Sequence, residues 1–248
     1  MEKNGMVNEI QIGFKMPPEW APHRATWIAW PTNKNDWPGK FTPIPLVVAE
    51  IVRYLHISEE VCILTSNQLV EKRAENILSH LGIELDNIKF YRCLYDRSWL
   101  RDSGPLFVKN GEKKYATLWK FNAWSKYKNF LNDLGVGAFI QETTKVSSLL
   151  ATYRGEWVVL EGGAIDVDGN GYVMATKECL LSQTQKRNPE FVQEDYEEVF
   201  TRYLGANKTI WLEGGIRGDD THGHIDDVAR FVAPGHVVAA HESKIYDD

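Results

Sequence analysis

The chain has 248 residues, of which 43% are apolar, so it is long enough to bury a sizeable core. Its formal charge of −6 comes from 34 acidic and 28 basic residues spread along the sequence. Neither a nucleic-acid-binding face nor a basic membrane anchor is therefore expected, and a small cationic ligand fits this charge better. Three widely separated cysteines, no transmembrane-length apolar run and no signal-peptide core at the N-terminus predict a cytoplasmic protein without disulfides or a cysteine-based zinc site.

Strand-like and helix-like segments alternate along the chain. In chain order they are a strand at 26–30, a helix at about 44–55, a strand at 61–64, a helix between Asn67 and Gly82, and a helix between Pro189 and Gly205. Asn67 is a favourable N-cap, and Gly82 and Gly205 are typical helix stops. Because no change of composition marks a boundary, we expect a single α/β domain over residues 1–248.

A short motif occurs twice in the sequence. Residues 158–163 and 210–215 each combine an apolar, strand-like run with Glu-Gly-Gly, and the two copies lie 52 residues apart. This recurrence indicates repeated structural units. The glycines would allow the backbone to approach another chain segment or a ligand closely.

The segment 218–227 contains four carboxylates and two imidazoles within ten residues. Like charges this close raise one another's pKa values, so the segment is expected to hold a cation, a metal ion or a proton in use. If the backbone is extended, the side chains of His224 and Asp226 point to the same side. Two alternatives stay open: a solvated acidic turn, and a metal-dependent hydrolase that uses His222, His224 and the neighbouring aspartates.

A second candidate lies at residues 98–105, where Trp99 and Asp102 are three positions apart. A guanidinium ion is planar and rich in N–H donors, so a site for it needs carboxylates in its plane and an aromatic ring against its face. Asp102, Asp226 and Trp99 supply that combination. The alternative for Asp102 is a structural salt bridge with Arg101.

Eight short motifs follow one another along the chain. They are Pro17-Pro18-Glu19-Trp20-Ala21-Pro22-His23, Trp27-x-Ala29-Trp30-Pro31, Trp99-x-Arg101-Asp102-x-Gly104-Pro105, Phe121-Asn122-Ala123-Trp124, Glu161-Gly162-Gly163, Glu178-Cys179-Leu180-Leu181, Arg187-Asn188-Pro189 and Gly218-Asp219-Asp220-Thr221-x-Gly223-His224-Ile225-Asp226. Their content and order between residue 17 and about residue 235 resemble the agmatine deiminase branch of the arginine deiminase and peptidylarginine deiminase superfamily.

The resemblance implies a fold and a reaction. The fold is a five-bladed α/β propeller of the pentein type, built of ββαβ repeats and incomplete in this chain, and the protein is expected to be a homo-oligomer. The reaction is hydrolysis of a guanidino group to a ureido group with release of ammonia and without a metal or other cofactor. Agmatine would give N-carbamoylputrescine in putrescine biosynthesis, while free arginine and protein-bound arginine stay open as substrates.

The resemblance also implies roles for individual residues. Asp102 and Asp226 would hold the guanidinium nitrogens, His224 would act as general acid and base, Glu161 would orient that imidazole, and Trp99 would line the pocket. The attacking cysteine of the family lies near its C-terminus, so we expect it to lie outside these 248 residues, and an inactive propeller fragment is a further alternative. None of the three cysteines present is expected to replace it: Cys62, Cys93 and Cys179.

Overall fold

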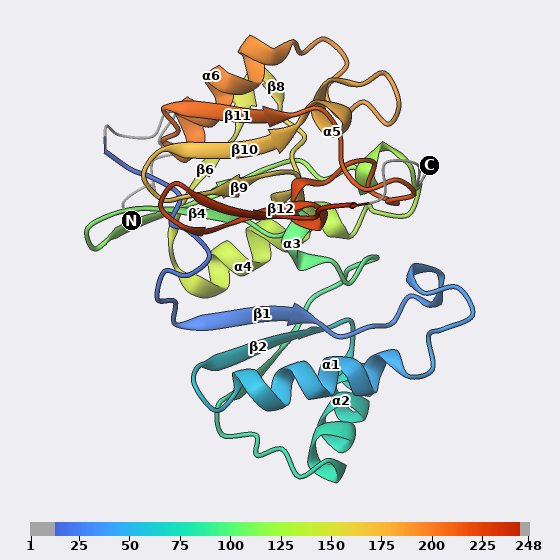
Figure 1. Ribbon diagram of the computed structural model, residues 1–248. Helices are drawn as coiled ribbons and strands as arrows, with labels where there is room; N and C mark the ends of the chain where they lie inside the picture. The colour runs from blue at the N-terminus through green and yellow to red at the C-terminus, as the bar shows by residue number, and fades with distance from the viewer. Residues whose placement is uncertain (1–12, 244–248) are drawn as a thin grey trace.

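The structure is a computed structural model that describes residues 13–243. This part of the chain forms three sheets of three strands and two of two strands. Helices lie beside the sheets, so the fold is of the predicted α/β class (Figure 1). No helix of the described residues is long and apolar enough to span a membrane.

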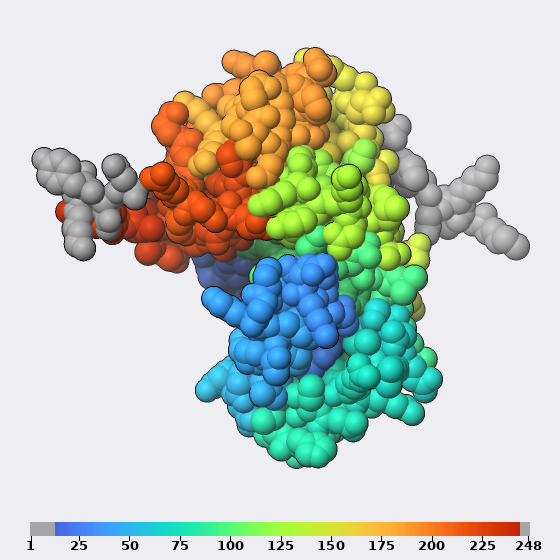
Figure 2. All heavy atoms as spheres, turned by 90° about the vertical axis from the view of Figure 1, so that its right-hand side faces the viewer, coloured from blue at the N-terminus to red at the C-terminus, as the bar shows by residue number. Residues whose placement is uncertain are grey.

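The first structural unit is an all-parallel sheet with two helices, and it projects below the rest of the molecule (Figures 1 and 2). In chain order its elements are β1 (Ala25–Ala29), α1 (Ile44–Leu55), β2 (Glu60–Thr65), α2 (Gln68–His80) and β3 (Ile88–Arg92). The three strands pair in the order β1-β2-β3.

Both predicted ends of the helix after Asn67 are confirmed, as is the end at Gly205, but the helix expected to begin at Pro189 begins only at Gln193. The side chain of Asn67 accepts hydrogen bonds from the first backbone N–H groups of α2 and so satisfies donors that have no partner within the helix. Gly82, just beyond α2, has a φ of 70°, which glycine adopts without the steric cost that a side chain would add. Gly205 has the same left-handed conformation and ends the third predicted helix.

The second and third units share one order of elements, two antiparallel strands, a helix and a strand parallel to the second. The second unit consists of β4 (Leu106–Asn110), β5 (Lys113–Leu118), α4 (Val136–Thr144) and β6 (Ser147–Leu150). The third consists of β9 (Asp166–Val167), β10 (Tyr172–Thr176), α6 (Gln193–Leu204) and β11 (Lys208–Leu212). These are the ββαβ repeats that the resemblance implied.

The remaining elements are short. They are the hairpins β7 (Thr152–Tyr153) with β8 (Glu156–Trp157) and β12 (Ala229–Ala233) with β13 (His236–Ala239), and the helices α3 (Leu100–Ser103) and α5 (Lys177–Leu181). The helix α3 lies in the candidate segment 98–105, directly before β4.

The first sheet is buried on both faces, which explains the nearly continuous apolar sequence of β2. Val61 and Ile63 point to the side covered by α1 and α2. Leu64 points to the other side and packs with Val136 and Ile140 of α4. The N-terminal unit is therefore fixed against the second unit, and this contact sets the position of the loops that follow β1 and β3.

Candidate active site

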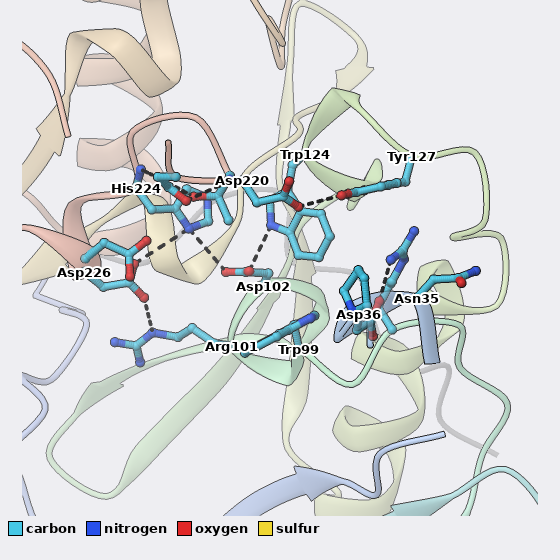
Figure 3. Close-up of a pocket in the computed structure, with 15 residues that line it drawn as sticks. Asn35, Asp36, Trp99, Arg101, Asp102, Trp124, Tyr127, Asp220, His224 and Asp226 are labelled. Carbon is cyan, nitrogen blue, oxygen red and sulfur yellow. Dashed lines mark hydrogen bonds and ion pairs between the residues drawn. The ribbon is translucent and has the colours of Figure 1, made fainter. Parts of the chain in front are cut away.

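A cavity of about 580 Å³ lies where loops from different units meet. It is bordered by the loop after β1, by the segment between β3 and β4, by the segment after β5, and by the loop between β11 and β12. Its labelled lining residues in Figure 3 are Asn35, Asp36, Trp99, Arg101, Asp102, Trp124, Tyr127, Asp220, His224 and Asp226.

The imidazole of His224 lies among three carboxylates. Its Nδ1 atom is 3.9 Å from Oδ1 of Asp102 and 3.7 Å from Oδ1 of Asp226. Its Nε2 atom is 3.8 Å from Oε2 of Glu161. Trp99, which is 42% exposed, lines the same cavity. The structure thus brings together the five residues that sequence analysis selected.

Asp102 is held in place before any ligand arrives. It lies in α3 and is only 8% exposed. Its Oδ1 accepts a hydrogen bond of 3.0 Å from the backbone N–H of Gly163, and its Oδ2 accepts one of 3.0 Å from Nε1 of Trp124. Burial raises the pKa of this carboxyl above its ordinary value.

The two glycines after Glu161 allow the close packing of the site. A Cβ atom at Gly163 would lie 2.5 Å from Nδ1 of His224, 2.8 Å from Oδ1 of Asp102 and 2.9 Å from Oδ2 of Asp226. A Cβ atom at Gly162 would lie 2.2 Å from a backbone carbonyl oxygen. At Gly162 the contact is with backbone, so only glycine fits there, whereas at Gly163 a Cβ atom would force the three side chains of the site to move. The expectation of a close backbone approach is confirmed.

The loop that carries His224 is shaped by Asp219. One oxygen of Asp219 accepts hydrogen bonds from the backbone N–H groups of Gly223 and His224, at 2.8 and 3.0 Å. These bonds hold a turn, and Ile225–Asp227 continues as a short 3₁₀ helix. The segment is therefore not extended, and the condition under which His224 and Asp226 would point to the same side of a strand is not met. The two polar side chains still face the cavity because Ile225 is buried in an apolar cluster.

The charges around His224 favour the imidazolium form. Burial alone would lower the pKa of His224, but contact with Cys179 and Glu161 and the charge of Asp102 raise it to about 11. Burial alone would raise the pKa of Glu161, but the positive charge of Arg187 and contact with His224 outweigh it and hold that pKa below its ordinary value. These shifts favour a protonated His224 beside an ionised Glu161, whose nearest atoms are 3.8 Å apart.

Two further residues support the site, and sequence analysis gave neither of them a role. Nε of Arg187 donates to both oxygens of Glu161 at 3.1 and 3.2 Å, and its Nη2 donates to the carbonyl oxygen of Thr221. Trp124 donates to Asp102. Both lie in motifs that carried the resemblance, and that was the only signal for them in the sequence.

The alternative salt bridge between Arg101 and Asp102 is not formed. Nη1 of Arg101 instead pairs with Oε1 of Glu19 at 2.6 Å, and its Nε lies 3.9 Å from Oδ2 of Asp226. Glu19 belongs to the first of the quoted motifs. That motif thus reaches the edge of the site through Arg101.

The metal site that would use His222 and His224 is not formed either. His222 has a left-handed backbone (φ 64°) and points to Ser182, whose Oγ is 3.0 Å from its Nε2. In residues 13–243, the side chains with a metal-like arrangement are Glu161, Cys179 and His224, whose ligand atoms lie within 4.8 Å of one another. Glu161 is already paired with Arg187, as described above.

None of the three cysteines, all of them in the described part of the chain, lines the cavity. Cys179 is fully buried behind His224, and its burial raises the pKa of the thiol. Burial also raises the pKa of Cys62 to about 12 and raises that of the half-buried Cys93. None therefore has the exposure and low pKa that a nucleophilic thiolate needs.

The ββαβ units and the polar cavity between them are those of a pentein-type α/β propeller. The chain belongs to the Porphyromonas-type peptidyl-arginine deiminase family, whose sequence profile matches residues 15–248. It is 35% identical over 235 residues to the agmatine deiminase of Ectopseudomonas mendocina, covering 92% of this chain and 60% of that protein. It is 34% identical over 238 residues to the agmatine deiminase of Stutzerimonas stutzeri, covering 93% of this chain and 61% of that protein.

Solved structures give the same result. The agmatine deiminase of Enterococcus faecalis, described as catalysing its reaction, superimposes with a TM-score of 0.83 and 32% identity. The match covers 94% of this chain and 62% of that one. This chain therefore spans about 60% of the length of the curated relatives that it matches.

Proposed function

We propose that this chain forms the guanidinium-binding and proton-transferring part of a deiminase that acts on agmatine. In the overall reaction, agmatine and water give N-carbamoylputrescine and ammonia, a step of putrescine biosynthesis. The observation that carries the proposal is the convergence of Asp102, Asp226 and His224, with separations of 3.7 and 3.9 Å from the imidazole, in one cavity. The proposal includes a single-domain, cytoplasmic, homo-oligomeric enzyme that uses no cofactor.

The binding step follows from the shape of the ligand. A guanidinium ion presents N–H donors in its plane and a flat face above and below it. Asp102 and Asp226 would accept from the edge, and the indole of Trp99 would cover a face. Since Gly163 and Trp124 already orient Asp102, little side-chain freedom is lost when the ligand binds.

The chemical step needs a positioned guanidinium and a proton donor. The guanidinium carbon is a poor electrophile because its charge is delocalised, so the two carboxylates would hold it for attack. The imidazolium of His224 would donate a proton to the nitrogen that leaves as ammonia. Glu161 would keep that imidazole charged and oriented. The proposal assigns the attack by a thiolate to none of the three cysteines of this chain.

The charge of the cavity favours agmatine over arginine. Six aspartates line the cavity together with two arginines. Agmatine carries an ammonium group at the end opposite the guanidinium, whereas free arginine carries a carboxylate there as well. An acidic cavity attracts the first and repels the second. The similarity to agmatine deiminases of other bacteria supports the same choice.

Titration calorimetry of the 248-residue chain with agmatine, free arginine and an arginine peptide tests the proposal. Agmatine should bind most tightly, and Asp102→Asn and Asp226→Asn should each weaken it by roughly 30-fold or more, since truncating one partner of a buried charge pair costs about 2–5 kcal/mol. Asp86→Asn removes the same charge from an exposed position and should change nothing. Near-normal agmatine binding by both site variants would refute the proposal.

A further inference from the structure

The outer face of α1 and the turn that follows it carry a row of exposed apolar side chains, here called the α1 patch. Its members are Leu46, Val47, Ile51, Tyr54 and Ile57, which are 50, 52, 48, 73 and 74% exposed. The opposite face of the helix, with Ala49 and Val52, packs into the core of the N-terminal unit. In Figure 1, α1 lies on the side of β1 and β2 turned away from β4 and α4.

The two other long helices do not share this property. In α1, two of twelve residues are charged, Glu50 and Arg53. In α2 the charged residues number four of thirteen, and in α6 five of twelve. A helix that is apolar on all sides is normally buried on all sides by other protein segments or by a membrane. The composition of α1 is therefore that of a helix with a second layer packed on it.

We propose that the α1 patch is the interface through which this chain pairs with a second copy of itself. With about half or more of each of its five large side chains exposed, the patch measures roughly 500 Å². That is within the range of about 300–600 Å² for the largest apolar patch of a soluble monomer, which is often functional. Two such patches would bury roughly 1,000 Å², the lower limit for a specific interface, before the surrounding rim is counted.

The charges of the patch also suit a copy of the same chain. The whole chain has a net charge of −6, so two copies repel each other over most orientations. The α1 patch is neutral, because Nε of Arg53 pairs with Oε2 of Glu50 at 3.0 Å. Contact through α1 therefore brings together the apolar surface without adding like charges.

A two-fold axis across α1 makes the pairing self-complementary. In such an isologous contact the two helices run antiparallel, so the start of one faces the end of the other. With the axis near Ile51, Leu46 faces Ile57 of the partner subunit, and Glu50 faces Arg53 of the partner subunit. Apolar and opposite-charge contacts are then made twice by the same residues.

The interface is separate from the candidate active site, because no member of the α1 patch lines the cavity. The inference rests on the homo-oligomeric part of the proposed function, but its test does not depend on agmatine binding, so the failure of one leaves the other standing. Sedimentation equilibrium should give a mass of twice 28.4 kDa for the 248-residue chain at micromolar concentration. Ile51→Glu places two like charges across the axis and should give the monomer mass. Leu69→Glu, the same type of change at a 58% exposed position of α2, should leave the dimer intact.

A second measurement detects contact without disrupting it. Ile51→Cys places a thiol next to the axis, so mild oxidation should give a disulfide-linked dimer, whereas Leu69→Cys should give none. Both variants also carry Cys93→Ser, because Cys93 is only half-buried, while Cys62 and Cys179 are buried and should not react. A monomeric wild-type chain, a dimer that survives Ile51→Glu, or an absence of cross-linking in Ile51→Cys would each overturn the proposal. An α1 patch that binds only a different protein or a lipid surface would do the same.

Discussion

The carboxylate of Asp102 accepts a hydrogen bond of 3.0 Å from the backbone N–H of Gly163, which lies 61 residues further along the chain. This bond joins two motifs that are separate in the sequence, the one around Trp99 and the Glu-Gly-Gly motif that begins at Glu161. Because Glu161 also lies beside His224, the short Glu-Gly-Gly segment contacts both the proposed ligand-binding acid and the proposed acid/base group.

Gly163→Ala is expected to weaken agmatine binding by about 100-fold. The added Cβ would lie 2.5–2.9 Å from atoms of His224, Asp102 and Asp226, so these three side chains would have to move apart. The proposed site depends on the relative positions of these three side chains. Displacements on the order of 1 Å in such sites commonly reduce activity about 100-fold, and a similar loss of affinity is expected here. Titration calorimetry measures the loss. Gly135→Ala is the matched control, because a Cβ there meets nothing within 4 Å and φ is −89°. Equal affinities of the two variants would contradict the explanation.

Trp124→Phe is expected to weaken agmatine binding while the protein stays folded. Phenylalanine keeps an aromatic ring but removes the Nε1–H that donates to Asp102. Loss of a hydrogen bond to a charged group costs about 1.5–3 kcal/mol, or roughly 10- to 100-fold in affinity. Trp211→Phe removes a comparable donor to Glu197 far from the cavity and should leave binding unchanged. If both variants bound as the wild type does, Trp124 would not position Asp102.

Features that depend on neighbouring residues could be predicted from the sequence. The helix ends are local, because the side chain of Asn67 caps the turn that follows it and Gly82 adopts a conformation that few other residues tolerate. The glycines at 162 and 163 were also expected to allow close approach. What the sequence could not supply was the atom that each glycine approaches, since that depends on how distant loops pack.

Features that depend on distant partners were missed or predicted wrongly. Arg187 pairs with a carboxylate 26 residues away, and Trp124 donates to one 22 residues away, so neither role was visible in a local pattern. The segment 224–226 is not extended, the condition considered for it in the sequence, because Asp219 draws the preceding backbone into a turn. The five site residues came together as expected through the family resemblance, which carries long-range information that spacing alone does not.

Agmatine binding is expected to weaken as the pH falls, and to do so above the range in which exposed aspartates titrate. Burial raises the pKa of both Asp102 and Asp226 from 3.8, while His224, with a pKa of about 11, stays charged throughout. A cationic ligand competes with the protons on these carboxyls, so binding should release protons at mildly acidic pH. Calorimetry in two buffers of different ionisation enthalpy measures that release.

The raised pKa values of Asp102 and Asp226 also affect the stability of the fold. Agmatine binding weakens as the pH falls, whereas the stability contributed by these carboxyls is lost as the pH rises. A carboxyl whose pKa is raised in the folded state holds its proton more tightly there than in the unfolded chain. Its contribution to the free energy of unfolding is therefore fully present below the unfolded pKa and is lost as the pH rises through the folded value. Asp226→Asn should thus reduce both the proton release and the loss of stability with rising pH. A pH-independent affinity between neutral and mildly acidic solution would contradict the assignment.

Arg187→Met is expected to destabilise the fold strongly. Arg187 and Glu161 are both fully buried as side chains, and the guanidinium bonds both carboxylate oxygens. Without it, Glu161 keeps only His224 as a compensating charge, and breaking a buried pair in this way costs about 3–5 kcal/mol. The urea midpoint should fall accordingly. Arg92→Met breaks an exposed pair with Glu71 and should barely move the midpoint. Adding Glu161→Gln to Arg187→Met removes the stranded charge and should recover part of the stability; if it recovers none, the loss arises from packing and not from charge.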